Sequence, residues 1–170
     1  MYNFKNWKNK TGTIPVSWTA DDYTTKTEWY AHHGGAGFKV YQHNQLEVYK
    51  DNIGVLIPEQ LLPVFDEVKK YFDLKDLVCD LSKYTPGMIL PWHSDTFPTY
   101  SKNMGITNLD DIVRIIIFLH QDEPGHQLWI EDKLCRGNAG TWFAWTGNQK
   151  HMAANIGESD RYVIQLTGHI

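Results

Sequence analysis

The pattern of hydrophobic and polar positions changes near residue 76, where short apolar runs begin to alternate with turn residues. The turn residues are Thr85-Pro86-Gly87, Glu123-Pro124-Gly125, Gly137-Asn138-Ala139-Gly140 and Ile156-Gly157-Glu158. Short strands separated by such turns are typical of a β-sandwich or barrel. The predicted strands cover residues 77–84, 88–95, 112–120, 127–131, 141–145, 151–155 and 161–167. With one further strand from the first half, these seven predict a mainly β protein with an eight-stranded jelly roll.

The first 75 residues follow a different pattern. Residues 1–40 mix aromatic side chains with Thr, Asn and Lys without a helical period, which predicts short strands and loops covering one side of the core. Residues 38–49 fit either a strand or a helix, and residues 52–57 a strand. His32 and His33 are adjacent and would point to opposite faces of a strand, so we do not expect them to bind one metal together.

A helix is expected from Pro58, because proline is tolerated at the first helical position. Pro63 should lie in the first turn or kink the helix. The helix carries an apolar stripe at the spacing that faces a core. The stripe consists of Leu61, Phe65, Val68 and Phe72.

Residues 96–111 interrupt the strand pattern with a polar, turn-rich stretch. Connections of this length without secondary structure are uncommon in compact domains, and many are lids or binding loops. The stretch directly follows the predicted strand 88–95, where the candidate chemistry begins. We therefore expect a long loop beside the site.

Composition and charge narrow the class of protein. Hydrophobic residues make up 42% of the 170 residues and aromatics 14%, which is typical of a globular chain. We expect a single domain over residues 1–170, with residues 1–75 as supporting strands and helix and residues 76–170 as the jelly-roll core. The net charge of −4 gives no general attraction to phosphate backbones, so a nucleic-acid partner is disfavoured.

The expected compartment is the cytoplasm. Residues 1–10 lack the apolar core of a signal peptide, and no apolar run is long enough to cross a membrane. Cys79 and Cys135 are the only cysteines, and without an export signal we expect free thiols.

The candidate chemistry starts at His93 and Asp95. Two residues apart on a strand, they share one face and can offer a nitrogen and an oxygen to one divalent metal. His151 begins a later predicted strand after a turn-like segment, and strands of a rolled sheet can meet at their ends. Two imidazoles and a carboxylate form the facial triad of non-haem Fe(II) oxygenases, which leaves metal positions open. A structural zinc site would close all four positions, usually with cysteines.

Three further residues are candidates for binding a carboxylate. Arg161 immediately precedes an apolar run, and an inward guanidinium is costly unless a carboxylate pairs with it. That carboxylate is either a ligand or a structural Asp or Glu. Arg114 lies in a strand that is apolar on both faces and can bind the same anion, a substrate carboxylate or an internal partner. The Tyr84 phenol can donate to a carboxylate, or the ring can serve packing alone.

These residues resemble the Fe(II)/2-oxoglutarate-dependent dioxygenase superfamily. The motifs that carry the resemblance are His93-x-Asp95, His151 and Arg161 in that order. Tyr84-Thr85-Pro86-Gly87, Phe118-Leu119 and Gly125-His126-Gln127-Leu128 are similar to prolyl hydroxylases. Arg114-Ile115-Ile116 and His151-Met152-Ala153-Ala154-Asn155 look like the aspartyl/asparaginyl hydroxylase branch. The resemblance covers residues 77–168.

The resemblance implies a double-stranded β-helix with Fe(II) held by His93, Asp95 and His151. It implies 2-oxoglutarate bound through Arg161 and Tyr84, use of O2, and hydroxylation of an amino acid, peptidyl residue or other small molecule with release of succinate and CO2. Ascorbate is a possible additional requirement. Asp95 at the carboxylate position argues against a halogenase.

Two positions depart from the family pattern. Val163 stands where some members have a serine that contacts the co-substrate, and Ile116 stands where the aspartyl hydroxylase branch has a histidine. Trp142, Phe143 and Trp145 alternate along the predicted strand 141–145, so one face of it should wall the cavity, and core packing alone would explain these residues equally well. Two alternatives stay open: a cupin-like metal enzyme that does not use 2-oxoglutarate, and a non-catalytic β-barrel binding module. The sequence does not indicate the substrate or the oligomeric state.

Overall fold

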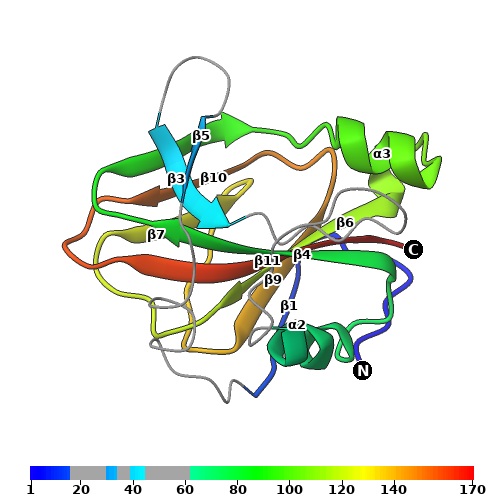
Figure 1. The fold of residues 1–170 in the computed structure, drawn as a ribbon, viewed down its shortest axis with the longest axis horizontal. Helices are drawn as coiled ribbons and strands as arrows, with labels where there is room; N and C mark the ends of the chain where they lie inside the picture. The colour runs from blue at the N-terminus through cyan, green and yellow to red at the C-terminus, as the bar shows by residue number, and fades with distance from the viewer. Residues whose placement is uncertain (16–29, 34–38, 45–61) are drawn as a thin grey trace.

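The computed structural model of the chain describes residues 1–15, 30–33, 39–44 and 62–170 (Figure 1). One sheet is formed by β1 (Lys10–Thr13), β2 (Tyr30–His33), β3 (Lys39–Asn44), β4 (Lys75–Tyr84), β6 (Ile112–Phe118), β9 (Thr141–Thr146) and β11 (Arg161–His169). The second is formed by β5 (Met88–His93), β7 (His126–Ile130), β8 (Lys133–Leu134) and β10 (His151–Asn155). The described helices are α2 (Leu62–Lys69), α3 (Pro98–Met104) and the 3-10 turn η2 (Leu109–Asp111).

Strands of the second half alternate between the two sheets, except that the successive strands β7 and β8 both lie in the smaller one. The larger sheet has the order β1-β9-β6-β11-β4-β3-β2 and the smaller one β5-β10-β7-β8, with antiparallel pairing throughout. Strands β4 to β11 therefore wind between two facing sheets. This arrangement is the predicted double-stranded β-helix.

The origin of the eighth strand corrects the prediction. It is β8, a strand of only two residues within the second half, and not a strand from the first half. The early strands extend the larger sheet instead: β1 pairs with β9 at one edge, and β3 pairs with β4 towards the other. A two-residue strand is too short to show a period-two pattern, so no sequence signal marked it.

Hydrophobic side chains fill two layers on either side of the larger sheet. Residues of both sheets form the layer between them, called here the inner core: Tyr84, Met88, Ile116, Phe118, Leu128, Ile130, Cys135, Phe143, Trp145, Ala153 and Val163. The other layer, the outer core, joins the far face of the larger sheet to the N-terminal segment and α2: Trp7, Ile14, Val68, Phe72, Cys79, Leu81, Val113, Ile115, Ile117, Leu119, Trp142, Ala144, Ile164 and Leu166. Strand β6 alternates between the two layers, which explains its continuous apolar run.

The helix predicted before β4 is present, with Pro63 in its first turn and Val68 and Phe72 in the outer core. Its predicted start at Pro58 and the predicted strand 52–57 lie outside the described residues. Within residues 38–49 the described part is a strand, β3.

The stretch 96–111 is not a structureless loop. It contains α3 and η2, and α3 ends at Gly105, whose φ of 68° is the left-handed conformation that glycine adopts readily. In Figure 1, α3 lies beyond the end of β5, and α2 lies on a different side of the molecule, beneath β1.

Both cysteines are buried, and, as predicted, neither forms a disulfide. Among the described helices, none has the length and apolar character needed to cross a bilayer.

Candidate metal centre

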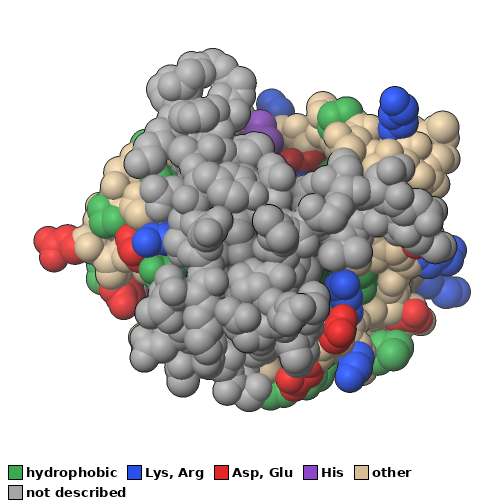
Figure 2. Space-filling view, viewed as in Figure 1, with side chains coloured by type: hydrophobic (Ala, Val, Ile, Leu, Met, Phe, Trp, Pro, Cys, Tyr) green, Lys and Arg blue, Asp and Glu red, His purple; other side chains and the backbone are tan. Residues whose placement is uncertain are grey.

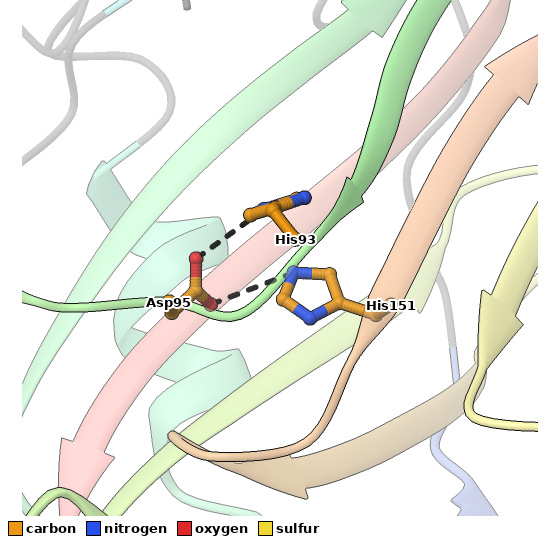
Figure 3. Close-up of side chains that lie close together, drawn as sticks. All are labelled: His93, Asp95 and His151. Atoms are coloured by element: carbon orange, nitrogen blue, oxygen red, sulfur yellow. Dashed lines mark ion pairs between the residues drawn. The ribbon is translucent and has the colours of Figure 1, made fainter. Parts of the chain in front are cut away.

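The pairing of β5 with β10 brings the predicted metal ligands together. His93 ends β5 and faces His151, the first residue of β10, across the sheet. Asp95 follows two residues after His93, and the ligand atoms of the three side chains all lie within 4.8 Å of one another. Figure 3 shows the two imidazoles and the carboxylate turned towards one another.

Asp95 lies between the two histidines. Its Oδ1 is 3.6 Å from His93 Nε2, and its Oδ2 is 3.6 Å from His151 Nε2. The predicted strand 88–95 ends earlier than expected, at His93, so Asp95 reaches the group from the following connection and not by strand alternation. The register also shifts between His151 and Ala153, where the pairing with β5 is irregular.

The other nitrogen of each imidazole is held by the backbone. His93 Nδ1 lies 2.7 Å from the carbonyl oxygen of Pro91, and His151 Nδ1 lies 3.1 Å from that of Gln149. A carbonyl only accepts hydrogen bonds, so Nδ1 carries the proton in both rings and Nε2 presents its lone pair to the shared space. Such backbone partners orient metal-binding histidines and fix their tautomer.

Charge and burial give the three groups different pKa values. Burial alone would raise the pKa of Asp95, but Arg114 and the two imidazoles outweigh it and lower that pKa well below its ordinary value. Burial lowers the pKa of His151 to about 4, and the neighbouring Asp95 raises the pKa of the less buried His93. The group therefore offers an ionised carboxylate and a neutral imidazole without prior loss of a proton.

Arg114 supports Asp95 from within the sheet. Its Nε donates to Asp95 Oδ2 at 3.2 Å, its Nη1 donates to Thr167 Oγ1 at 2.6 Å, and its guanidinium carbon lies 4.8 Å from the centre of the Phe97 ring. Phe97 has a φ of 44°, a left-handed conformation that is strained for a non-glycine residue. Of the partners considered for Arg114, the structure gives it a carboxylate of the metal group itself.

Arg161 points inward, as predicted, and is only 2% exposed. It begins β11 opposite Tyr84 of β4, and its guanidinium lies over the rings of Tyr84 and Phe118 at 5.4 and 5.0 Å. Neither Nε nor Nη2 of Arg161 has a hydrogen-bond partner among the described residues. A buried guanidinium with two unused donors is costly on its own, and a bound carboxylate would satisfy it.

Asp122 is a buried carboxylate near Arg161 that was not singled out from the sequence. Its side chain is 4% exposed, and its Oδ1 lies 3.9 Å from Arg161 Nε, beyond hydrogen-bonding distance. Arg136 Nη1 donates to the other oxygen at 2.6 Å. Asp122 precedes a Pro-Gly turn, where acidic residues are usually solvated, so local pattern gave no sign of its burial.

Aromatic residues connect the metal group to Arg161. Phe118 lies under Arg161 and 5.6 Å from Phe143, and Trp145, two residues further along β9, packs its ring 4.6 Å from that of His151. Phe143 and Trp145 belong to the inner core, and Trp142 to the outer core. The indole nitrogen of Trp145 is buried and has no hydrogen-bond partner among the described residues. The inner face of β9 is therefore the wall between the two candidate sites.

The metal group lies close to the molecular surface. His93 is partly exposed, and Figure 2 shows histidine and acidic side chains at the surface of this face of the molecule. Arg161, by contrast, lies inside the inner core. The end of the candidate site that holds the metal group is thus accessible from the surface, and the end at Arg161 is enclosed.

No family model matches the chain, and none of the curated proteins matches it. Solved structures do. KdgF from Halomonas sp. matches with a TM-score of 0.47 and 15% identity over 87% of this chain and 91% of that one. A prolyl-4-hydroxylase from Pseudomonas putida matches with a TM-score of 0.44 and 18% identity over 66% of this chain and 62% of that one. A cupin protein from Bacteroides fragilis matches with a TM-score of 0.40 and 13% identity over 59% and 71%.

These likenesses concern the fold alone. The chain's own strand order gives a double-stranded β-helix fold. Its smaller sheet and the connection that follows β5 carry a His-Asp-His group that can hold a metal ion.

Proposed function

We propose that this chain is an Fe(II)- and 2-oxoglutarate-dependent oxygenase that hydroxylates an amino acid, a peptidyl residue or another small molecule. The observation that carries the proposal is Arg161, a buried guanidinium with two unpartnered donors inside the same barrel as the metal group. A metal site alone would fit many cupin-like proteins. A second, enclosed site for a carboxylate fits a co-substrate that carries one carboxylate to the metal and another away from it.

The donor set of His93, Asp95 and His151 fits Fe(II). Two imidazole nitrogens and one carboxylate oxygen are the donor set typical of non-haem Fe(II) oxygenases, and these three residues would hold the ion while leaving metal positions open to further ligands. A closed structural zinc site would need a fourth protein ligand, and the described His, Cys, Asp and Glu residues supply only these three to the group.

Arg161 fits the distant carboxylate of 2-oxoglutarate. Two donors on one guanidinium match two carboxylate oxygens, and burial makes such a pair strong. Tyr84 lies against the same guanidinium and supports its position. Ile116 and Val163 belong to the apolar inner core, so neither supplies the polar contact that the family's histidine or serine would make. The Trp145 indole N–H, which has no hydrogen-bond partner among the described residues, is a donor available beside His151.

When bound, Fe(II) and 2-oxoglutarate supply oxidation of a substrate C–H bond by O2, with succinate and CO2 as co-products. The protein's own residues bind and orient. His93 and His151 present Nε2, Arg114 holds the ionised Asp95, and Arg161 fixes the far end of the co-substrate. The aromatic inner core excludes water between the two ends.

The test measures metal binding, 2-oxoglutarate binding and succinate release on the purified full chain. We expect one equivalent of Fe(II), binding of 2-oxoglutarate to the metal-loaded protein, and succinate release even without a primary substrate. His93→Ala should lose metal and succinate release, whereas His120→Ala, which removes an imidazole outside the group, should retain both. Arg161→Gln should keep the metal but weaken 2-oxoglutarate binding by about a hundredfold or more, because a buried charge pair is lost.

The alternative is a cupin-like metal enzyme that does not use 2-oxoglutarate. It is favoured by Asp122, which stands near enough to Arg161 to act as a structural counter-ion. In that case the wild type would bind metal with no measurable affinity for 2-oxoglutarate, and Arg161→Gln would affect stability alone. A chain that binds neither would be a non-catalytic β-barrel module.

A further inference from the structure

Asp122 is placed so that it can compete with any ligand for Arg161. Its Oδ1 lies 3.9 Å from Arg161 Nε, and both side chains are almost fully buried. A charge-assisted hydrogen bond would need a separation of about 2.7–2.9 Å, so the carboxylate stands roughly 1 Å too far away. Arg161 Nε makes no hydrogen bond among the described residues, and the opposite charges of the two side chains attract each other. Another contact must therefore keep Asp122 at this distance.

Arg136 is the residue that holds it. Arg136 Nη1 donates to Asp122 Oδ2 at 2.6 Å and to the carbonyl of Glu123 at 3.2 Å. The backbone N–H of Asp122 also donates to the carbonyl of Gly137, which ties the two loops together. The side chain of Arg136 is 44% exposed, so it approaches Asp122 from the solvent side while Arg161 approaches from the inside.

Among the described residues around Arg161, two arginines share one ionised carboxylate. Asp122 lies between the two arginines, and Glu123 accepts from the Ser159 hydroxyl on the outer side. His126, 3.8 Å from Asp122, adds no charge near neutral pH because burial lowers its pKa. Cys135 also stays neutral, since burial raises the pKa of its thiol to about 11. With Asp122 committed to Arg136, Arg161 is left to bind one further carboxylate.

We propose that Arg136 and Asp122 are a positioning pair that keeps Arg161 open for the carboxylate of a ligand. Without Arg136, Asp122 closes on Arg161 Nε and occupies the anion site. The specific ligand rests on the proposed function, in which it is 2-oxoglutarate. The contact between Asp122 and Arg161 does not depend on that choice.

The first experiment measures the dissociation constant of 2-oxoglutarate on the metal-loaded full chain by titration calorimetry. Arg136→Met should weaken binding about tenfold, a size usual for coupled neighbouring charges, without loss of metal. The double variant Arg136→Met with Asp122→Asn should return to within about threefold of the wild type, since an uncharged amide no longer competes as an anion. Lys70→Met, which removes an exposed positive charge on the far side of the larger sheet, is the matched control and should bind like the wild type.

A purely structural role for Arg136 predicts the opposite pattern. If Arg136 only ordered its loop, the double variant would bind as weakly as Arg136→Met, and the proposal would be overturned. Unchanged binding in Arg136→Met would overturn it as well.

The second experiment separates this proposal from the proposed function. Crystal structures of the ligand-free wild type and of Arg136→Met should show the Asp122 Oδ1 to Arg161 Nε distance shortening from 3.9 Å to hydrogen-bonding range. If the wild type fails to bind 2-oxoglutarate, the proposed function fails, but a shortened contact would still support the positioning pair. An unchanged distance in the variant would contradict the pair, whatever the wild type binds.

Discussion

Arg114 is a charged residue in direct contact with one of the candidate metal ligands. It donates to Asp95 Oδ2, the oxygen that also faces His151, and is itself held by Thr167. Residues that orient a metal ligand in this way commonly contribute about 10–100-fold to metal affinity. We expect Arg114→Met to weaken Fe(II) binding by about that factor, measured by competition with a metal-sensitive dye. Tighter binding in the variant would show instead that the guanidinium competes with the metal for Asp95.

His126 is buried in its neutral form, which makes the folding stability depend on pH. Its Nδ1 accepts from the Glu123 N–H, and its Nε2 lies 3.2 Å from the carbonyl of Ser159. Burial lowers its pKa below the ordinary 6.5, despite Asp122 nearby, while His120 and Arg161 act in the same direction as burial. The unfolded chain then binds a proton more readily, so folding stability falls as the pH drops below 6.5.

Urea unfolding of the wild type and His126→Gln between pH 8 and pH 5 isolates this contribution. Glutamine keeps a neutral donor and acceptor without the titration. We expect the free energy of unfolding of the wild type to decline relative to that of the variant as the solution becomes acid. A difference that stays constant with pH would mean that His126 does not titrate during unfolding.

The turn between β9 and β10 determines where His151 sits. Gly147 lies in this turn, and a Cβ there would meet the carbonyl oxygen of Leu109 at 2.7 Å and the Phe97 ring at 3.2 Å. Gly147→Ala therefore forces the turn away from η2, at an expected cost of about 1–3 kcal/mol in stability together with weaker metal binding. Gly87→Ala is the comparison, because a Cβ there meets nothing, although the φ of 86° costs about 1–2 kcal/mol.

Circular dichroism melting and metal titration of both glycine variants check this prediction. The metal affinities of the two variants, more than their stabilities, decide between the outcomes. Equal metal affinity in the two variants would show that the β9–β10 turn does not position His151.

Strands of the second half could be predicted because the apolar periodicity and the turn residues indicate the same strand boundaries. Residues 151–155 match β10, and in the turn before β5 the N–H of Met88 donates to the Thr85 carbonyl, with Pro86 and a left-handed Gly87 between them. Helix α3 was missed because its sequence is polar and buries only Tyr100, so it has no apolar stripe to detect.

At the candidate site, the sequence was enough to find the polar and charged residues that stand in apolar surroundings, but it was not enough to find the residues that contact them. Two histidines, an acid and an inward arginine stand out in apolar surroundings. Asp122 and Thr167 do not, because their roles arise from contacts between strands and loops distant in sequence. The carbonyl groups that orient the imidazoles belong to the backbone and carry no residue signature at all.

On the scale of the whole molecule, the two faces of the larger sheet have different roles, one in the candidate site and the other in stability. Its inner face carries Arg114 and Arg161, and its outer face packs against α2 and the N-terminal segment. An aromatic cluster forms that outer contact, in which the Trp142 ring lies 4.7 Å from Tyr2 and 5.4 Å from Phe72. Stability and chemistry should therefore respond to different substitutions.

Trp7 tests this separation most directly. It is 1% exposed, its ring lies 6.2 Å from Trp142, and its indole nitrogen has no hydrogen-bond partner among the described residues. Trp7→Ala should lower the free energy of unfolding by about 3–5 kcal/mol, as deletion of a buried aromatic ring does. Trp7→Phe should lose less, since it keeps a ring and removes the unpartnered N–H, and Ile156→Ala, at a 62% exposed position, should stay within about 0.5 kcal/mol of the wild type.

Metal affinity measured on the same variants completes the argument. Below their unfolding temperatures, all three should bind Fe(II) as tightly as the wild type, because the aromatic cluster and the metal group lie on opposite sides of the larger sheet. Weakened binding in folded Trp7→Ala would show that strain crosses the sheet from the outer core to Arg114. The larger sheet would then transmit changes between the two layers and would not isolate one from the other.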